Sequence, residues 1–274
     1  MEFVISFLNT ILPVLYFVTT YLYGMYFFRD DPFAEKYMSP MLKVTVSIHL
    51  IEIVLRGIYF SHYPLASIAE AFSVIALAAV SIYIYLEFRL KVKTTGYFIL
   101  VFVFFMQLFS SAFISFTHDI PDILHNPLFS FHSSAAVLGY SGFAISFLYS
   151  LMYLLLFHDI KTRRFGVIYS RLPSLEVLSG LNYNSALIGF SCLSLAIVIG
   201  TFWSHKIFGS LVNLDPKILV AYATWIIYGL ELFGGKIFQW SNKRLAYLSV
   251  SGFVFILFSM VAVNLFLTSF HEFK

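Results

Sequence analysis

The amino-acid sequence predicts an all-α membrane protein, a polytopic bundle of about eight transmembrane helices with both termini on the extracytoplasmic side. Of its 274 residues, 60% are hydrophobic and only 11% are charged, whereas a soluble globular protein carries about 25% charged residues. So few charges cannot cover a water-exposed surface, and lipid is the solvent that tolerates such an apolar exterior. The composition therefore excludes a soluble domain, a disordered chain and a collagen-like repeat. The net charge of +3 is too small to suggest a nucleic-acid partner.

Long apolar runs give the individual helices. A transmembrane helix needs about 20 predominantly apolar residues. Such runs occupy residues 3–28, 41–60, 64–86, 95–116, 133–157, 183–204, 217–234 and 246–269. The first run shows no small-residue cleavage pattern after a short apolar core, so we expect a retained helix and not a removed signal peptide. We expect residues 1–274 to form a single integral membrane domain.

Basic residues in alternate loops set the orientation, because cytoplasmic loops are enriched in Lys and Arg. Most of the 17 basic residues follow the first, third, fifth and seventh runs: Arg29, Lys36, Lys43, Arg89, Lys91, Lys93, Lys161, Arg163, Arg164, Arg171, Lys236, Lys243 and Arg244. The opposite side carries only Lys206, Lys217 and Lys274, and Arg56 lies within a run. These four loops are therefore predicted to face the cytoplasm.

The predicted extracytoplasmic segments are rich in histidine: His62, His118, His125, His132, His205 and His271. A histidine at a membrane boundary is most often an amphipathic interface residue. His132 and His271 differ because each lies at one end of an apolar run, on the same side of the membrane. Two imidazoles on separate helices could hold one iron from opposite faces.

The second apolar run contains His49, Glu52 and Arg56 at spacings that place them on one helical stripe. Glu52 and Arg56 could form a structural ion pair that braces the bundle. Alternatively, His49 is a ligand and Arg56 meets an anionic group in a polar site, because charged groups at membrane depth usually face the bundle interior or a water-filled cavity. Glu70 and Glu231 are further buried carboxylates, which could partner Arg56 or lie near helix ends.

Other kinds of site find little support. The sequence shows no Ser–His–Asp set, no Gly-rich phosphate loop and no carboxylate pair spaced for hydrolysis. Its single cysteine, Cys192, excludes an internal disulfide framework and a Cys-based zinc site. We interpret Cys192 as a small apolar packing residue.

Four segments carry a resemblance to a known family. They are HLIEIVLRGIYFSHYPLASIAEAF, NPLFSFHSSAAVLGYSGFAISF, GTFWSHKIFGSLVNLDPKILVAYATWIIYGLELF and NKRLAYLSVSGFVFILFSMVAVNLFLTSFHEF. They resemble the cytochrome c assembly family, the haem-handling membrane proteins of the CcsA, CcmC and HemX types, with its tryptophan-rich (WWD) signature at about residues 200–219. The matching residues are His49, Arg56, Pro64, Glu70, His132, Gly200, Trp203, Gly209, Asp215, Pro216, Lys217, Trp225, Tyr228, Asn264 and His271.

The resemblance implies a protein that binds haem b transiently and presents it on the extracytoplasmic face to apocytochrome c. It implies axial iron ligation by His132 and His271, and a porphyrin shelf formed by Trp203, Phe208 and the loop that contains Asp215. The inner cofactor-binding residues that it implies are His49 and Arg56. A partner membrane protein with a large extracytoplasmic domain is also implied, as is a location in the bacterial cytoplasmic membrane or its organellar equivalent. The chain would be at most a subunit of a haem lyase, and otherwise a haem chaperone.

The sequence departs from the family pattern at several positions. Signature aromatic residues are replaced by Phe208, Leu211, Val212 and Leu214, and a second intramembrane histidine of the family aligns with Phe233. The outer histidine pair is retained, whereas His49 lacks its partner. An alternative is therefore a HemX-like regulator or scaffold of haem biosynthesis with a decayed haem site. A transporter of an unrelated small molecule is the third hypothesis.

Overall fold

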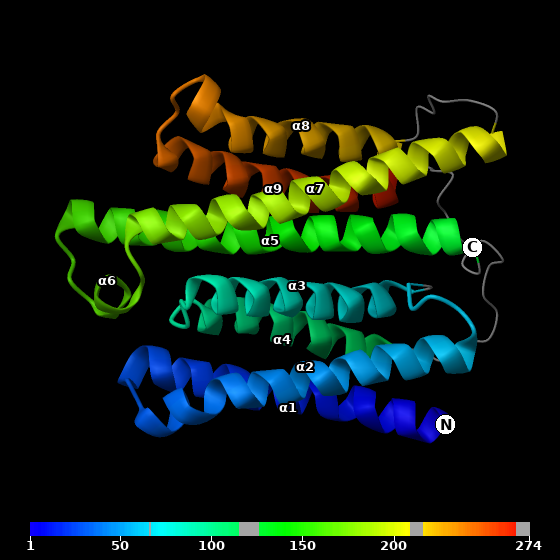
Figure 1. Ribbon diagram of the computed structural model, residues 1–274, viewed down its shortest axis with the longest axis horizontal. Helices are drawn as coiled ribbons and strands as arrows, with labels where there is room; N and C mark the ends of the chain where they lie inside the picture. The colour runs from blue at the N-terminus through cyan, green and yellow to red at the C-terminus, as the bar shows by residue number, and fades with distance from the viewer. Residues whose placement is uncertain (66, 115–125, 209–215, 267–274) are drawn as a thin grey trace. The chain divides into compact units, whose positions relative to one another are not determined.

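The computed structural model describes residues 1–65, 67–114, 126–208 and 216–266, without the side chains of residues 203–208 and 260–266. Every regular element of these residues is a helix (Figure 1). The helices are α1 (Glu2–Arg29), α2 (Pro32–Phe60), α3 (Ile68–Leu90), α4 (Gly96–Phe113), α5 (Pro127–Thr162), α6 (Val167–Arg171), α7 (Leu175–Phe208), α8 (Pro216–Ile237) and α9 (Asn242–Phe266). The predicted all-α class is confirmed, and each predicted span overlaps one long helix.

Six of the described helices are long and apolar enough to cross a membrane by length and composition: α1, α3, α4, α5, α7 and α8. The protein is thus an integral membrane protein. Helices α2 and α9 are not in this set, and α2 carries buried Glu52 and Arg56 besides two lysines. The count of eight spans and the orientation of the termini stay predictions.

Helix α5 begins earlier than its apolar run predicts. Asn126 caps it, because its Oδ1 accepts a hydrogen bond from the N–H of Leu128 at 2.9 Å, and Pro127 occupies the first helical position. The helix is 36 residues long, about 54 Å at 1.5 Å per residue. His132 therefore lies in the second turn of a helix, and not in the preceding loop where the apolar run placed it.

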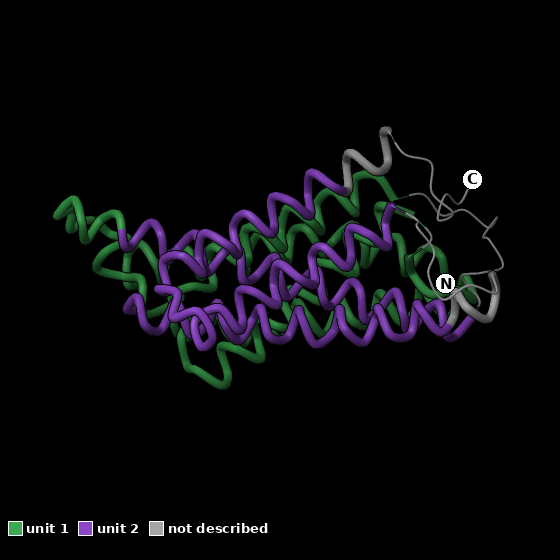
Figure 2. Tube along the Cα trace, turned by 90° about the horizontal axis from the view of Figure 1, so that it is seen from above, with its two compact units in different colours: residues 1–125, 158–173 green, residues 126–157, 174–274 purple. Residues whose placement is uncertain are grey.

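The chain divides into two compact units (Figure 2). Unit 1 comprises residues 1–125 and 158–173, and unit 2 comprises residues 126–157 and 174–274. Helix α5 starts in unit 2, and its last residues, from His158 onward, belong to unit 1.

Unit 1 contains helices α1 to α4 and the short α6. An ion pair joins the end of α6 to the end of α1, since Nη1 of Arg171 lies 2.7 Å from Oδ1 of Asp30. Asp30 closes α1 in the left-handed conformation, with φ of 55°. The hydrogen bond from the Arg171 guanidinium holds the pKa of the exposed Asp30 carboxyl below its usual value. This contact ties α6 to the predicted cytoplasmic end of α1.

Unit 2 contains most of α5 together with α7, α8 and α9. Helices α5 and α7 cross closely at glycines, as is common between membrane helices. A Cβ added to Gly142 would lie 2.7 Å from the Cα of Gly189, and one added to Gly189 would lie 2.9 Å from the carbonyl oxygen of Gly139. Helix α8 adds a ring stack, with the Tyr228 and Phe143 centroids 3.6 Å apart.

Candidate functional site

The end of the α5–α7 crossing nearest the start of α5 positions His132. Its imidazole lies directly over Gly200 of α7, so that a Cβ at Gly200 would be 2.8 Å from Cε1 and 2.9 Å from Nδ1. Gly189 and Gly200 are eleven residues apart, about three helical turns, and therefore share one face of α7. The crossing that brings Gly142 onto Gly189 thus also brings His132 onto Gly200.

A backbone carbonyl fixes the tautomer of His132. Nδ1 of His132 lies 2.9 Å from the carbonyl oxygen of Ala196, which is four residues before Gly200 and on the same face of α7. A carbonyl can only accept, so Nδ1 carries the proton and the neutral ring has its lone pair on Nε2. This is the arrangement in which proteins orient metal-ligating histidines. The half-buried imidazole is therefore prepared to act as a ligand through Nε2.

The remaining residues predicted for the outer site are only partly described. Trp203 and Phe208 lie in the last turns of α7, and their side chains are not among those described. Asp215 and His271 lie outside the described residues. The C-terminal ends of α7 and α9 and the N-terminal ends of α5 and α8 are found at the same end of unit 2 (Figure 1). The backbone thus brings residues 200–208 and 216–219 to the end of unit 2 that bears His132.

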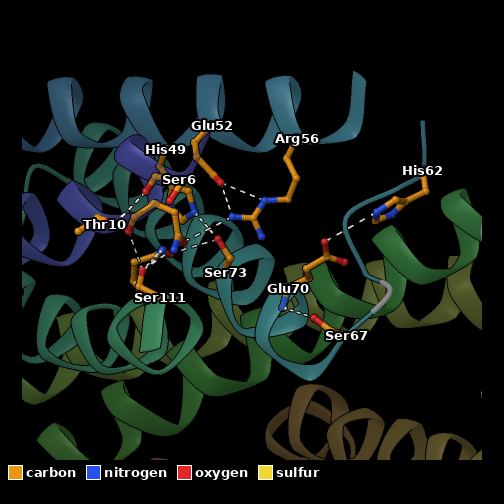
Figure 3. A network of polar contacts seen from close by, with 12 residues as sticks. Ser6, Thr10, His49, Glu52, Arg56, His62, Ser67, Glu70, Ser73 and Ser111 are labelled. Atoms are coloured by element: carbon orange, nitrogen blue, oxygen red, sulfur yellow. Dashed lines mark hydrogen bonds and ion pairs between the residues drawn. The ribbon is translucent and has the colours of Figure 1, made fainter. Parts of the chain in front are cut away.

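His49 is placed in the interior of unit 1, where both of its ring nitrogens are hydrogen-bonded (Figure 3). The hydroxyl of Tyr16 lies 2.8 Å from Nδ1, and that of Ser73 lies 2.9 Å from Nε2. The chain of contacts continues from Ser73 to Gln107 at 3.2 Å and from Gln107 to Ser111 at 3.1 Å. Ligation of iron by His49 would require one of its two hydrogen bonds to break.

Glu52 and Arg56 form the predicted i, i+4 ion pair, and both side chains are fully buried. The guanidinium donates to Oε1 of Glu52 through Nε at 3.0 Å and also through Nη2, and Nη2 is 3.4 Å from Oδ1 of Asn9. A buried guanidinium and carboxylate need such partners because each alone would be strongly desolvated. The geometry is that of a structural pair joining α2 to α1.

The other two carboxylates lie elsewhere. Glu70 is in the first turn of α3, where its backbone N–H donates a hydrogen bond to the hydroxyl of Ser67. Its Oε1 is 3.9 Å from Nε2 of His62. In Figure 3 it is drawn between Arg56 and His62. Glu231 belongs to a separate polar cluster in unit 2, in which Asn182 donates to its Oε1 at 3.0 Å.

Sequence reasoning did not identify the groups that orient these side chains. Gly200 matched a family pattern, but its place beneath His132 depends on the register between α5 and α7. The one available signal was the eleven-residue separation of Gly189 and Gly200, which places both glycines on one face of α7. The carbonyl of Ala196 gives no sequence signal. Nor do Tyr16 and Ser73 around His49, since hydroxyl residues are common throughout the chain.

Comparisons with known proteins agree on one group. Residues 65–271 match the family described as Cytochrome C assembly protein. The cytochrome c biogenesis protein CcsA of Guillardia theta is 26% identical, over 93% of this chain and 91% of that protein. Protein HemX of Brevibacillus brevis is 27% identical, over 80% of this chain and 84% of that protein.

A solved structure has the same fold. The cytochrome c haem lyase CcmF matches 95% of this chain with a TM-score of 0.64 and 14% sequence identity. This chain spans 50% of the CcmF chain.

Proposed function

The chain belongs to the cytochrome C assembly protein family, and on this premise we propose that it is a haem-binding membrane component of cytochrome c maturation. In this role it holds haem at the extracytoplasmic face for delivery to apocytochrome c. Its relatives named as cytochrome c biogenesis proteins support the process. The proposed location is the bacterial cytoplasmic membrane or its organellar equivalent.

One observation supports haem binding by this chain most directly. His132 presents Nε2 as its lone-pair nitrogen because Nδ1 is engaged by the carbonyl of Ala196. Imidazole in this tautomer is a suitable axial ligand for haem iron. His271 is the proposed second ligand, and Trp203, Phe208 and the segment with Asp215 are the proposed shelf for the apolar porphyrin face.

The haem, when bound, supplies the vinyl groups that react with the cysteine thiols of apocytochrome c. The residues of this chain contribute position and protection: imidazoles hold the iron, and apolar and aromatic side chains exclude water from the porphyrin. The buried Glu52–Arg56 pair and the doubly bonded His49 support a bracing role in unit 1, because the guanidinium bonds the Glu52 carboxylate and both ring nitrogens of His49 are engaged by hydroxyl groups. A membrane partner with a large extracytoplasmic domain is proposed to receive or align the apocytochrome.

The test is an absorption spectrum of the detergent-purified protein. We expect a Soret band for the wild type, and its loss in His132→Ala, in His271→Ala and in the double variant. His158→Ala is the matched control, because His158 is an exposed imidazole near the opposite end of the same helix α5. Imidazole added to His132→Ala should restore part of the band. A wild-type protein without a Soret band after haem loading would reject the proposal.

The second candidate function is a HemX-like regulator or scaffold of haem biosynthesis. Two observations favour it: the similarity to HemX over most of both chains, and the replacement of signature aromatics by Leu211, Val212 and Leu214. Under this hypothesis the purified protein is colourless, while deletion or overproduction of the chain changes the level of haem precursors in cells. Measuring both quantities in one strain separates the two functions.

A further inference from the structure

Unit 2 contains a buried carboxyl group that neither the family comparison nor the proposed haem site uses. Glu231 lies on α8 with only 3% of its surface exposed. Its Oε1 accepts a hydrogen bond from Nδ2 of Asn182 at 3.0 Å. Its Oε2 is buried and has no hydrogen-bond partner among the described residues. Oε2 of Glu231 is therefore a buried polar atom whose interaction remains to be explained.

The groups that surround Glu231 come from three other helices and are neutral. Asn182 of α7 accepts at Oδ1 from the hydroxyl of Ser146 of α5, and Ser146 contacts the hydroxyl of Ser249 of α9 at 2.7 Å. Tyr228, one turn earlier on α8, is the titratable neighbour, and its hydroxyl is 3.3 Å from the carbonyl oxygen of Ser249. None of these contacts brings a cation to the carboxyl.

The burial of the carboxyl and its few hydrogen bonds favour the neutral acid over the charged form. Asn182 uses its carbonyl oxygen to accept from Ser146, so its amide group is the donor to Oε1 of Glu231. A charged carboxylate with one bare oxygen would be desolvated without compensation, which costs far more than burying the neutral acid. A proton is the smallest ligand that removes the charge, and it requires no cavity.

We propose that Glu231 is a proton-binding site, and that the packed form of unit 2 holds this carboxyl as the neutral acid at neutral pH, with the proton on Oε2. Glu231 lies six positions before Ile237, the last residue of α8, a rise of about 9 Å. Four helices meet at this one neutral group, so loss of the proton places a bare charge in their common interior.

Infrared difference spectroscopy of the full-length protein in lipid tests the proposal. The wild-type spectrum minus that of Glu231→Gln should show the C=O stretching band of a protonated carboxylic acid at pH 7, with a downward shift in deuterated buffer. Glu231→Gln keeps the acceptor for Asn182 and removes the ionisable group without adding a charge, so the variant should still fold. Carboxylate bands in place of the acid band at pH 7, or a frequency that changes with added Na⁺ or divalent cations, would overturn the proposal.

Chemical modification gives a second readout with a matched control. An apolar carbodiimide reacts with a protonated carboxyl in an apolar environment: the acid proton moves to a carbodiimide nitrogen, the carboxyl oxygen bonds to the central carbon, and nothing leaves. Mass spectrometry should place one added reagent molecule on Glu231. Glu176 is exposed in the first turn of α7, and should instead react with a water-soluble carbodiimide. Labelling of Glu176 but not of Glu231 by the apolar reagent would contradict the neutral acid.

Discussion

At the scale of single residues, the position of His132 depends on a glycine, Gly200, in the neighbouring helix. Gly200 leaves room for the imidazole of His132, and the turn before it supplies the carbonyl that fixes the tautomer. The imidazole of His132 is therefore oriented by backbone atoms of a neighbouring helix, which mutation of surrounding side chains does not remove. A glycine in a helix costs about 1 kcal/mol relative to alanine. The contact with His132 gives this glycine a structural reason.

Gly200→Ala is expected to displace His132 and reduce haem binding. The new methyl group would lie 2.8 Å from Cε1, so the ring must turn away and its bond to Ala196 breaks. We expect a weaker and shifted Soret band while the thermal midpoint changes little, because the ring is at the end of the bundle. Gly180→Ala on the same helix meets nothing within 4 Å and should keep the wild-type spectrum. Equal spectra for both variants would refute the role of Gly200.

The Glu52–Arg56 pair gives a second prediction at this scale. Arg56→Ala leaves a buried carboxylate without its cation and should lower the free energy of unfolding by about 3–5 kcal/mol. Replacing both residues, as Glu52→Gln with Arg56→Met, removes both charges and should recover most of that loss. Thermal unfolding of the single and double variants, followed by circular dichroism, measures the coupling. Additive losses in the double variant would show that the two charges do not depend on each other.

At the scale of helices, glycines determine how closely α5 and α7 approach. Gly142→Ala would bring a Cβ within 2.7 Å of backbone atoms of Gly189, and backbone cannot give way as a flexible side chain can. We expect a loss of about 1–3 kcal/mol, the usual cost of overpacking. Gly180→Ala again serves as control, and should be neutral or slightly stabilising. The measurement is the denaturation midpoint in detergent, and an unchanged midpoint for Gly142→Ala would contradict the close crossing.

Helix boundaries show how far sequence reasoning reaches. Apolar runs predicted where the long helices lie, because lipid imposes one requirement on every span. They could not predict that α5 starts at Pro127, although Asn126 and Pro127 together are a helix start by capping chemistry. A search for apolar residues places the helix boundary where polar residues begin. The backbone hydrogen bonds of α5 extend beyond that point, to Pro127. His132 was thus predicted in a loop before its span, whereas it lies inside helix α5.

The polar clusters show what sequence alone cannot supply. The i, i+4 spacing predicted the Glu52–Arg56 pair, because both partners lie on one helix. The partners of His49 and Glu231 come from helices distant in the sequence, and their pairing depends on helix register. Ser and Asn are too frequent in this chain for their pairing to be read from composition.

At the scale of the whole molecule, the distribution of basic residues predicts the topology, and labelling of single cysteines can test it. The chain has one cysteine, so Cys192→Ser gives a cysteine-free background. In intact cells a membrane-impermeant maleimide should label Ser61→Cys, which is exposed after α2 on the predicted outer side, and not Lys91→Cys, which is exposed after α3. After cell lysis both positions should react. The reverse pattern would invert the orientation and place His132 on the cytoplasmic side.

The hydrogen bond between His132 and the Ala196 carbonyl also bears on electron distribution. An acceptor on Nδ1 draws the proton partly away from the ring and makes Nε2 a stronger electron donor. Stronger donation stabilises ferric over ferrous iron, which lowers the reduction potential of any haem held there. Backbone geometry at one turn of α7 would in this way favour the ferric state of a haem bound through His132.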